Sequence, residues 1–71
     1  MKNVKLLRFN AYATGDNGVN YRAVAMTENN ETVWRLCKEV KIGLQWDFVN
    51  ETRYTDAVNA INAIRMYELT K

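Results

Sequence analysis

The sequence has no proline, no histidine and no serine, and its 71 residues include a single cysteine. Nucleophile sites that pair serine or cysteine with histidine cannot be assembled from this inventory. Zinc and haem sites usually need histidine or several cysteines, and Cys37 alone cannot form an intramolecular disulfide. We therefore predict no metal, no cofactor and a fold that is held together by side-chain packing.

Long hydrophobic runs are also missing. Lys2, Lys5 and Arg8 interrupt the apolar residues at the start of the chain, so no signal-peptide core is present there. No stretch approaches the roughly 20 apolar residues that a membrane helix requires. These absences predict a cytoplasmic protein with no membrane partner.

The residues that are present suit a small globular domain. Hydrophobic residues make up 48% of the chain, and two Trp, four Tyr and two Phe supply large side chains for a core. A chain this short buries too little surface to be divided into two stable units, so residues 1–71 are predicted to form one domain.

The first half of the chain reads as extended strands. In residues 4–13 every second side chain from Leu7 to Ala13 is apolar, which predicts a first strand with Leu7 and Phe9 on its buried side. Glycine, Asp and Asn at residues 15–18 predict a chain reversal, followed by a second strand over residues 21–27. A further turn is expected at residues 28–31, where two Asn can adopt positive φ.

A longer period-two pattern begins at Thr32. Apolar side chains occupy most even positions from Trp34 to Phe48, which predicts a third strand with a break near Gly43. The pattern leaves open whether residues 44–49 form a fourth strand. Trp46 and Phe48 are predicted to close the core, and a peptide-anchoring patch is the alternative for these two rings.

The C-terminal third has the spacing of an amphipathic helix. Apolar residues recur every three or four positions from Tyr54 to Tyr67, and Thr52 or Thr55 is expected to cap the first turn. The predicted fold is therefore α+β: a small antiparallel meander of three or four strands with one C-terminal helix packed on one face (βββα).

A pair of carboxylates remains a possible catalytic arrangement. Glu39, Asp47, Glu51 and Asp56 could pair as acid and base only inside a pocket that shifts one pKa. One sheet with one helix rarely encloses such a volume, so we predict no catalytic residues and no enzyme activity. Cys37 lies in a predicted strand without a neighbouring base and is expected to be a packed side chain.

Charge is distributed unevenly along the chain. Residues 1–41 carry a net charge of +3 and residues 42–71 a net charge of −1. If the helix covers the side with Leu7, Phe9, Trp34 and Leu36, alternation predicts a basic, aromatic face on the other side of the sheet. The residues expected on that face are Arg8, Asn10, Tyr12, Tyr21, Arg35, Glu39 and Lys41.

This exposed face is the predicted partner-binding site, formed by Arg8, Asn10, Tyr12, Tyr21, Arg35 and Lys41. Tyr and Arg are enriched at the energetic centres of protein interfaces, so the leading hypothesis is a non-enzymatic protein that binds another protein. An accessory or inhibitory protein of a phage or mobile element would fit this size, and self-association is compatible with it. The alternative is nucleic-acid binding through the same face, although a total charge of +2 is low for that function.

Overall fold

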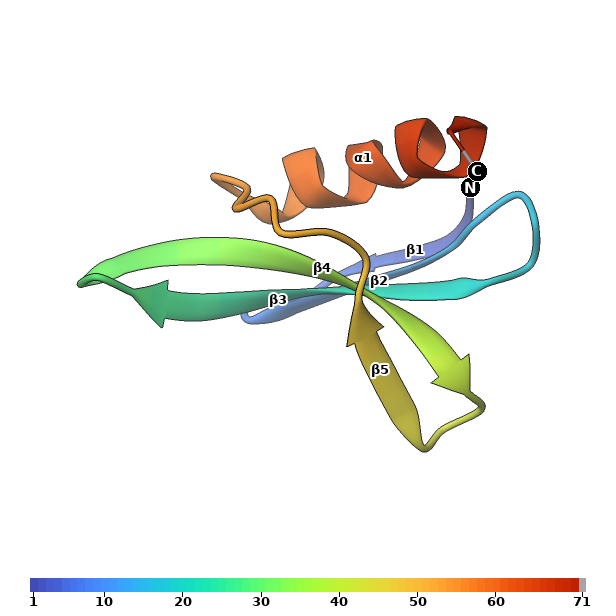
Figure 1. Cartoon of the computed structure of the whole chain (residues 1–71), viewed down its shortest axis with the longest axis horizontal. Coiled ribbons are helices and arrows are strands. Elements are labelled where there is room, and N and C mark those ends of the chain that lie inside the picture. The colour runs from blue at the N-terminus through green and yellow to red at the C-terminus, as the bar shows by residue number, and fades with distance from the viewer. Residues whose placement is uncertain (71) are drawn as a thin grey trace.

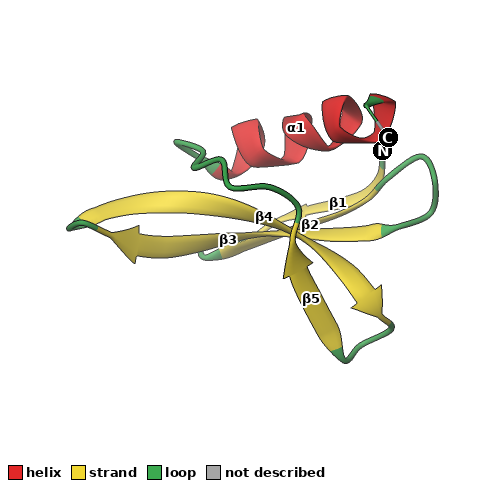
Figure 2. Ribbon diagram, viewed as in Figure 1, coloured by secondary structure: helices red, strands yellow, loops and turns green. Residues whose placement is uncertain are grey.

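The structure is a computed structural model that describes residues 1–70, and over this range it has five strands and one helix (Figures 1 and 2). The strands are β1 (Lys2–Leu6), β2 (Asn10–Thr14), β3 (Asn20–Glu28), β4 (Glu31–Lys41) and β5 (Gln45–Phe48), and the helix is α1 (Ala57–Leu69). Each strand pairs antiparallel with the next one in the chain. The predicted α+β meander with one C-terminal helix on one face is confirmed.

The predicted first strand is in fact two strands. The Leu7 amide donates a hydrogen bond to the Asn10 carbonyl over 2.9 Å and closes a turn between β1 and β2. Leu7 and Phe9 lie in this turn and are 47% and 59% exposed, so their predicted place under the helix is wrong. The apolar alternation continued through the turn, and no Gly, Pro or Asn–Gly pair marked the reversal.

The other turns lie where the sequence predicted them. Asn29 and Asn30 have φ of 52° and 66° between β3 and β4, which Asn tolerates better than other residues with a Cβ. Gly43 has φ of 71° at the predicted break, and the following residues form β5. The strand that the sequence left open is therefore present, and the sheet has five strands instead of three or four.

The core lies between α1 and the central strands, and small side chains dominate it. The fully or nearly fully buried cluster consists of Ala11, Ala13, Tyr21, Ala23, Leu36, Ala60, Ile61 and Ile64. Alternation along β2 and β3 places the alanines on the side that faces the helix. Because alanine has so little bulk, the helix can approach the sheet closely there.

Asp56 caps the helix. Its carboxylate accepts the Asn59 amide over 2.7 Å, so neither Thr52 nor Thr55 is the cap. Thr55 instead accepts a hydrogen bond from the Asn59 side chain over 2.8 Å. Within residues 1–70, the structure contains no helix with the length and apolar character needed to span a membrane.

Glu68 fastens the end of α1 to the β2–β3 turn. Its carboxylate accepts the Tyr21 hydroxyl over 2.9 Å and the Asp16 amide over 3.1 Å. A Cβ at Gly15 would lie 2.8 Å from the Tyr21 ring and would also collide with the Glu68 side chain. The turn therefore requires glycine at this position for reasons of space.

The sheet rolls away from the helix at its β5 edge. In Figure 1 the β4–β5 hairpin bends below the sheet, on the side opposite α1. The pairing of β4 with β5 shifts register between Glu39 and Lys41, and such irregularities increase local twist. The face opposite the helix is consequently concave and partly covered by the hairpin.

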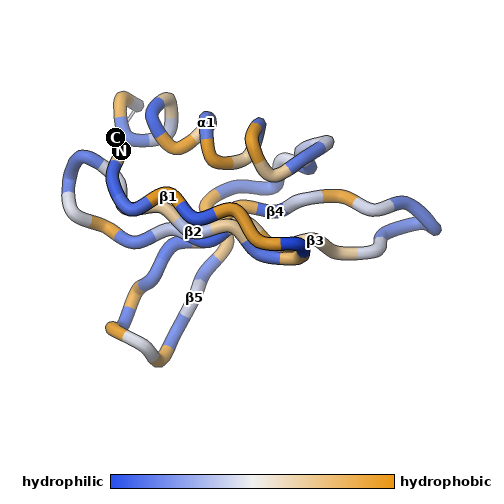
Figure 3. Tube along the Cα trace, turned by 180° about the vertical axis from the view of Figure 1, so that it is seen from behind, coloured by the Kyte–Doolittle hydropathy of each residue, from blue (hydrophilic) through white to orange (hydrophobic). Residues whose placement is uncertain are grey.

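The β1–β2 and β4–β5 turns contain apolar residues with exposed side chains. Figure 3 colours the chain by the hydropathy of each residue. At the β4–β5 turn Ile42 is 90% exposed and Leu44 is 75% exposed, and Val40 before them is half exposed. The second half of the apolar row that begins at Trp34 is therefore not part of the core beneath α1.

The Tyr21–Glu68 contact generates a prediction for high pH. Burial and the hydrogen bond to Glu68 raise the pKa of Tyr21 from 10.0 to about 12. Because the folded pKa lies above the unfolded one, this stabilisation is complete below pH 10 and is lost as the pH rises toward 12. Tyr21→Phe should cost about 1 kcal/mol at pH 7, the usual net value of one hydrogen bond. Between pH 10 and 12 its free energy of unfolding should fall less than that of the wild type.

Urea unfolding at several pH values would measure both quantities. Tyr12→Phe is the matched control, because it also removes one phenol and Tyr12 is not hydrogen-bonded to Glu68. Equal losses of stability above pH 10 in the wild type and Tyr21→Phe would contradict the prediction.

Candidate functional site: an aromatic and arginine face

The side of the sheet opposite α1 carries a group of aromatic and arginine side chains that range from largely buried Arg35 to half-exposed Phe48. We call it the aromatic–arginine face, and it consists of Tyr12, Arg22, Arg35, Trp46 and Phe48. Strand register explains the grouping: Tyr12 pairs with Arg22, Arg22 with Cys37, and Cys37 with Phe48. Side chains at directly paired positions point to the same side of a sheet.

Trp46 is the central side chain of this face. Its ring meets that of Tyr12 edge-on, with centroids 6.5 Å apart and planes at 70°, and the Arg22 guanidinium lies 4.8 Å from its centroid. β5 thus reaches across β4 and β3 toward β2. The prediction that Trp46 and Phe48 close the core under the helix is wrong, because the β4–β5 turn returns them on the Cys37 side of the sheet.

Arg35 is held in place by several contacts. Its guanidinium lies 4.4 Å from the centroid of Phe48, donates to a Glu28 carboxylate oxygen over 3.4 Å, and donates to the Asn50 carbonyl over 3.2 Å. Glu28 also accepts a hydrogen bond from Arg53. Arg53 first and Arg35 second lower the pKa of the Glu28 carboxyl below its usual value, so this acid is ionised at neutral pH beside Arg35.

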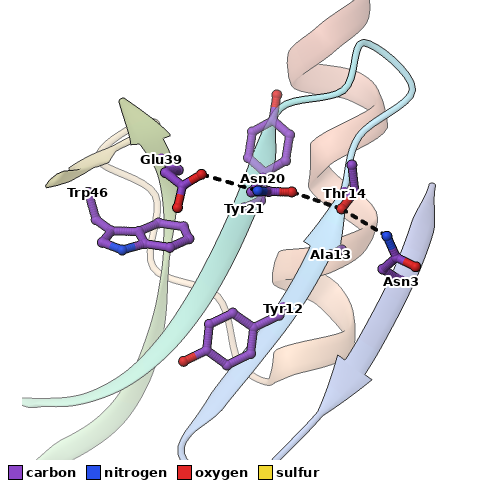
Figure 4. Close-up of a pocket in the computed structure, with 8 residues that line it drawn as sticks. All are labelled: Asn3, Tyr12, Ala13, Thr14, Asn20, Tyr21, Glu39 and Trp46. Carbon is purple, nitrogen blue, oxygen red and sulfur yellow. Dashed lines mark hydrogen bonds between the residues drawn. The ribbon is translucent and has the colours of Figure 1, made fainter. Parts of the chain in front are cut away.

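A row of polar side chains crosses the same side of the sheet near the chain start (Figure 4). Asn3 donates to the Thr14 hydroxyl over 3.5 Å, the Thr14 hydroxyl donates to Asn20 over 2.9 Å, and Asn20 donates to Glu39 over 3.1 Å. Glu39 also accepts the Gly43 amide over 3.0 Å, which ties the β4–β5 turn to the row. The carboxylate of Glu39 is therefore committed to structural hydrogen bonds.

Two hollows flank Trp46. The first, of about 350 Å³, lies over the polar row and is lined by Asn3, Tyr12, Ala13, Thr14, Asn20, Tyr21, Glu39 and Trp46 (Figure 4). The second, of about 240 Å³, is lined by Arg22, Val24, Met26, Cys37, Trp46 and Phe48. One hollow is therefore rich in hydrogen-bonding groups, and the other is mainly apolar with one arginine.

Within residues 1–70 this side of the sheet shows no assembled metal or acid–base site. Among residues 1–70, no three Cys, Asp or Glu side chains lie close enough together to hold a metal ion. Asp47, Glu51 and Asp56 are exposed, and Glu39 is bonded as described above. The absence of enzyme activity stays a prediction.

The structure gathers some of the predicted partner-binding residues and separates others. Asn10, Tyr12 and Arg35 lie on the side opposite α1, as predicted. Tyr21 is 1% exposed and lies under the helix, so its predicted place on the exposed face is wrong. Arg8 lies in the β1–β2 turn against Phe9, and Lys41 ends β4 beside the next turn. Neither belongs to the aromatic–arginine face.

The sequence prediction missed Arg22, and it gave Trp46 and Phe48 a binding role only as the alternative to core packing. The alternating alanines of β2 and β3 were the available signal, because Ala11, Ala13 and Ala23 mark the side that accepts the helix. Tyr21 lies two residues from Ala23 and therefore points to the same side of the sheet as Ala23. Arg22 points to the opposite side, together with its partner Tyr12. The prediction instead used the larger apolar residues to choose the buried side.

Comparisons with protein-family models, with curated proteins and with solved structures found no match to the chain. The case for a function therefore depends on the residues of the aromatic–arginine face and their surroundings.

The burial of Cys37 beneath the aromatic–arginine face generates a second prediction, which concerns the reactivity of its thiol. Cys37 is 6% exposed beneath the face, and burial raises the pKa of its thiol, so little thiolate should form near neutral pH. At pH 8 we expect a disulfide reagent to react with the folded protein at least about tenfold more slowly than with the urea-unfolded chain. Phe48→Ala should accelerate the reaction of the folded protein, because Phe48 lines the hollow above the thiol.

Met66→Ala is the control, since Met66 is 65% exposed on the helix and far from the thiol in the fold. Circular dichroism would establish that each variant is folded. Identical rates for Phe48→Ala and the wild type would show that this ring does not shield Cys37.

Proposed function

We propose that this chain is a non-enzymatic binding protein that associates with another protein through the aromatic–arginine face. The observation that carries the proposal is the set of half-exposed aromatic rings with arginines stacked on them around Trp46. Trp, Tyr and Arg are the residue types most enriched among interface hot spots. A cytoplasmic location and an accessory or inhibitory role are parts of this proposal.

The charges of this side of the sheet support a protein partner over a nucleic acid. By strand register its charged side chains include four basic and three acidic ones, a net charge of +1: Lys2, Lys5, Arg22, Arg35, Glu28, Glu31 and Glu39. Arg35 already interacts with Glu28. Nucleic-acid surfaces usually present several basic groups to the phosphates, and here one arginine is neutralised and two acids lie nearby.

The concave shape also supports this proposal. Trp46 stands between two hollows, so a partner can place side chains on both sides of one large ring. Hot spots of protein interfaces are typically such rings in partly enclosed positions. The rings are already fixed by mutual contacts, which lowers the entropy cost of binding.

Affinity capture from a lysate of the source organism, followed by binding measurements with the purified partner, would test the proposal. Trp46→Ala should weaken binding by about 2 kcal/mol, or roughly thirtyfold in Kd. Met66→Ala on the outer side of α1 should bind like the wild type. Affinity should change little as salt rises, because few net charges are involved.

The opposing results are equally specific. A captured protein that binds Trp46→Ala and the wild type equally would refute the proposed surface. A nucleic-acid mobility shift that Trp46→Ala abolishes, with affinity that falls steeply between about 50 and 200 mM salt, would support the nucleic-acid alternative instead.

A further inference from the structure

The apolar hollow beside Trp46 has the dimensions of a site for one side chain. Its volume of about 240 Å³ is below the roughly 300–1,000 Å³ of typical small-molecule sites. Val24, Met26 and Phe48 supply apolar walls, and the buried Cys37 forms part of the lining. A single aliphatic or aromatic side chain of a larger partner suits this space better than a cofactor does.

Arg22 lines the same hollow and differs from Arg35 in its hydrogen-bond partners. Its Nε is buried and has no hydrogen-bond partner within the part of the chain that the structure describes. Arg35 also has a buried Nε without a partner, but its terminal nitrogens bond to Glu28 and to the Asn50 carbonyl. The Arg22 guanidinium instead lies over the Trp46 ring, in a cation–π contact. Among residues 1–70 no acid forms a salt bridge with Arg22, so its positive charge is available to an acid of a partner.

The contact with Trp46 favours a carboxylate as the acceptor for Arg22. The Arg22 guanidinium carbon lies 4.8 Å from the centroid of the Trp46 ring, and a planar guanidinium can bind a carboxylate through two parallel hydrogen bonds from its nitrogens. Less side-chain freedom is then lost on binding, because the ring already fixes the position of the guanidinium. Glu28 and Glu39 on the same side of the sheet disfavour a doubly charged phosphate more strongly than a singly charged carboxylate.

We propose that the partner protein contributes a segment with an Asp or Glu side chain that binds Arg22, and a neighbouring apolar side chain that fills the 240 Å³ hollow. The inference rests on the proposed function and specifies its chemistry. The charge complementarity with Arg22 and the size of the hollow identify this ligand. Arg22 and Trp46 act together, since the ring orients the guanidinium that makes the ionic contact.

A displayed library of random linear peptides, selected on the full-length wild-type protein, is the probe. Enriched peptides should carry Asp or Glu within two residues of a large apolar residue. Arg22→Gln should lower the affinity of a resynthesised peptide by about 10- to 100-fold, the usual range for a hydrogen-bonded charged pair. Replacing the peptide's acid by its amide should cause a similar loss. The two losses should not add when the changes are combined, because they remove the same contact.

Matched variants separate this contact from a general effect of charge. Arg65→Gln makes the same chemical change at an exposed position of α1 and should leave affinity unchanged. Arg22→Lys keeps the charge without the planar fork and should bind more weakly than the wild type but more strongly than Arg22→Gln. Circular dichroism of each variant would establish that it is folded.

The outcomes distinguish the inference from the proposed function. Peptides that need Trp46 but lack an acid, or that bind Arg22→Gln as well as the wild type, would overturn the inference and leave the binding surface intact. A requirement for a free C-terminal carboxylate in place of an acidic side chain would also overturn it. If no peptide is enriched, the inference fails and the proposed function is decided by the effect of Trp46→Ala on the captured partner. If Trp46→Ala binds the enriched peptides unchanged, the proposed surface fails together with the inference.

Discussion

The close contact between α1 and the alanines of the sheet is the constraint on which the rest of the structure depends. Ala11, Ala13 and Ala23 on the strands meet Ala60 on the helix, and all four are almost completely buried. Only a few large side chains, chiefly Tyr21, Leu36 and Ile64, are fully enclosed in this layer. Since strand side chains alternate, a sheet with its small residues under the helix presents its bulky ones on the other side.

The rolled β4–β5 hairpin partly covers those bulky residues. Trp46 and Phe48 lie over β3 and β4. Arg22 of β3 contacts the Trp46 ring, and Arg35 of β4 contacts the Phe48 ring. The molecule therefore has a dense alanine-rich layer beneath the helix and a looser aromatic layer on the opposite side. The looser layer contains both hollows, and its side chains combine partial exposure with fixed positions.

Much of the fold could be predicted from period and turn chemistry. The long alternation after Thr32, the Asn pair at residues 29–30 and the spacing of the C-terminal apolar residues each identified an element correctly. The β1–β2 turn could not be read, because it contains Leu7, Arg8 and Phe9, which are not typical turn residues. Missing this turn also put Leu7 and Phe9 on the wrong side of the sheet.

The candidate site was predicted less well than the fold, for a related reason. The alternation of side chains along a strand shows which residues share a side of the sheet, but it does not show which side packs against the helix. Tyr12 and Arg35 were placed correctly, whereas Tyr21 was taken as a surface residue although its ring fills the core. The position of Trp46 over β3 depends on the roll of the hairpin, a property of the whole sheet that no local sequence pattern records.

Asp16 brings the beginning and the end of the described chain together. Its carboxylate accepts the Met1 amine over 2.8 Å, and its own amide donates to Glu68 near the end of α1. In Figure 1 this end of the molecule lies beside the helix, away from the β4–β5 hairpin that carries Trp46. A fluorophore or surface linker attached to the exposed side of α1, for example at Met66, would therefore lie on the other side of the sheet from the aromatic rings.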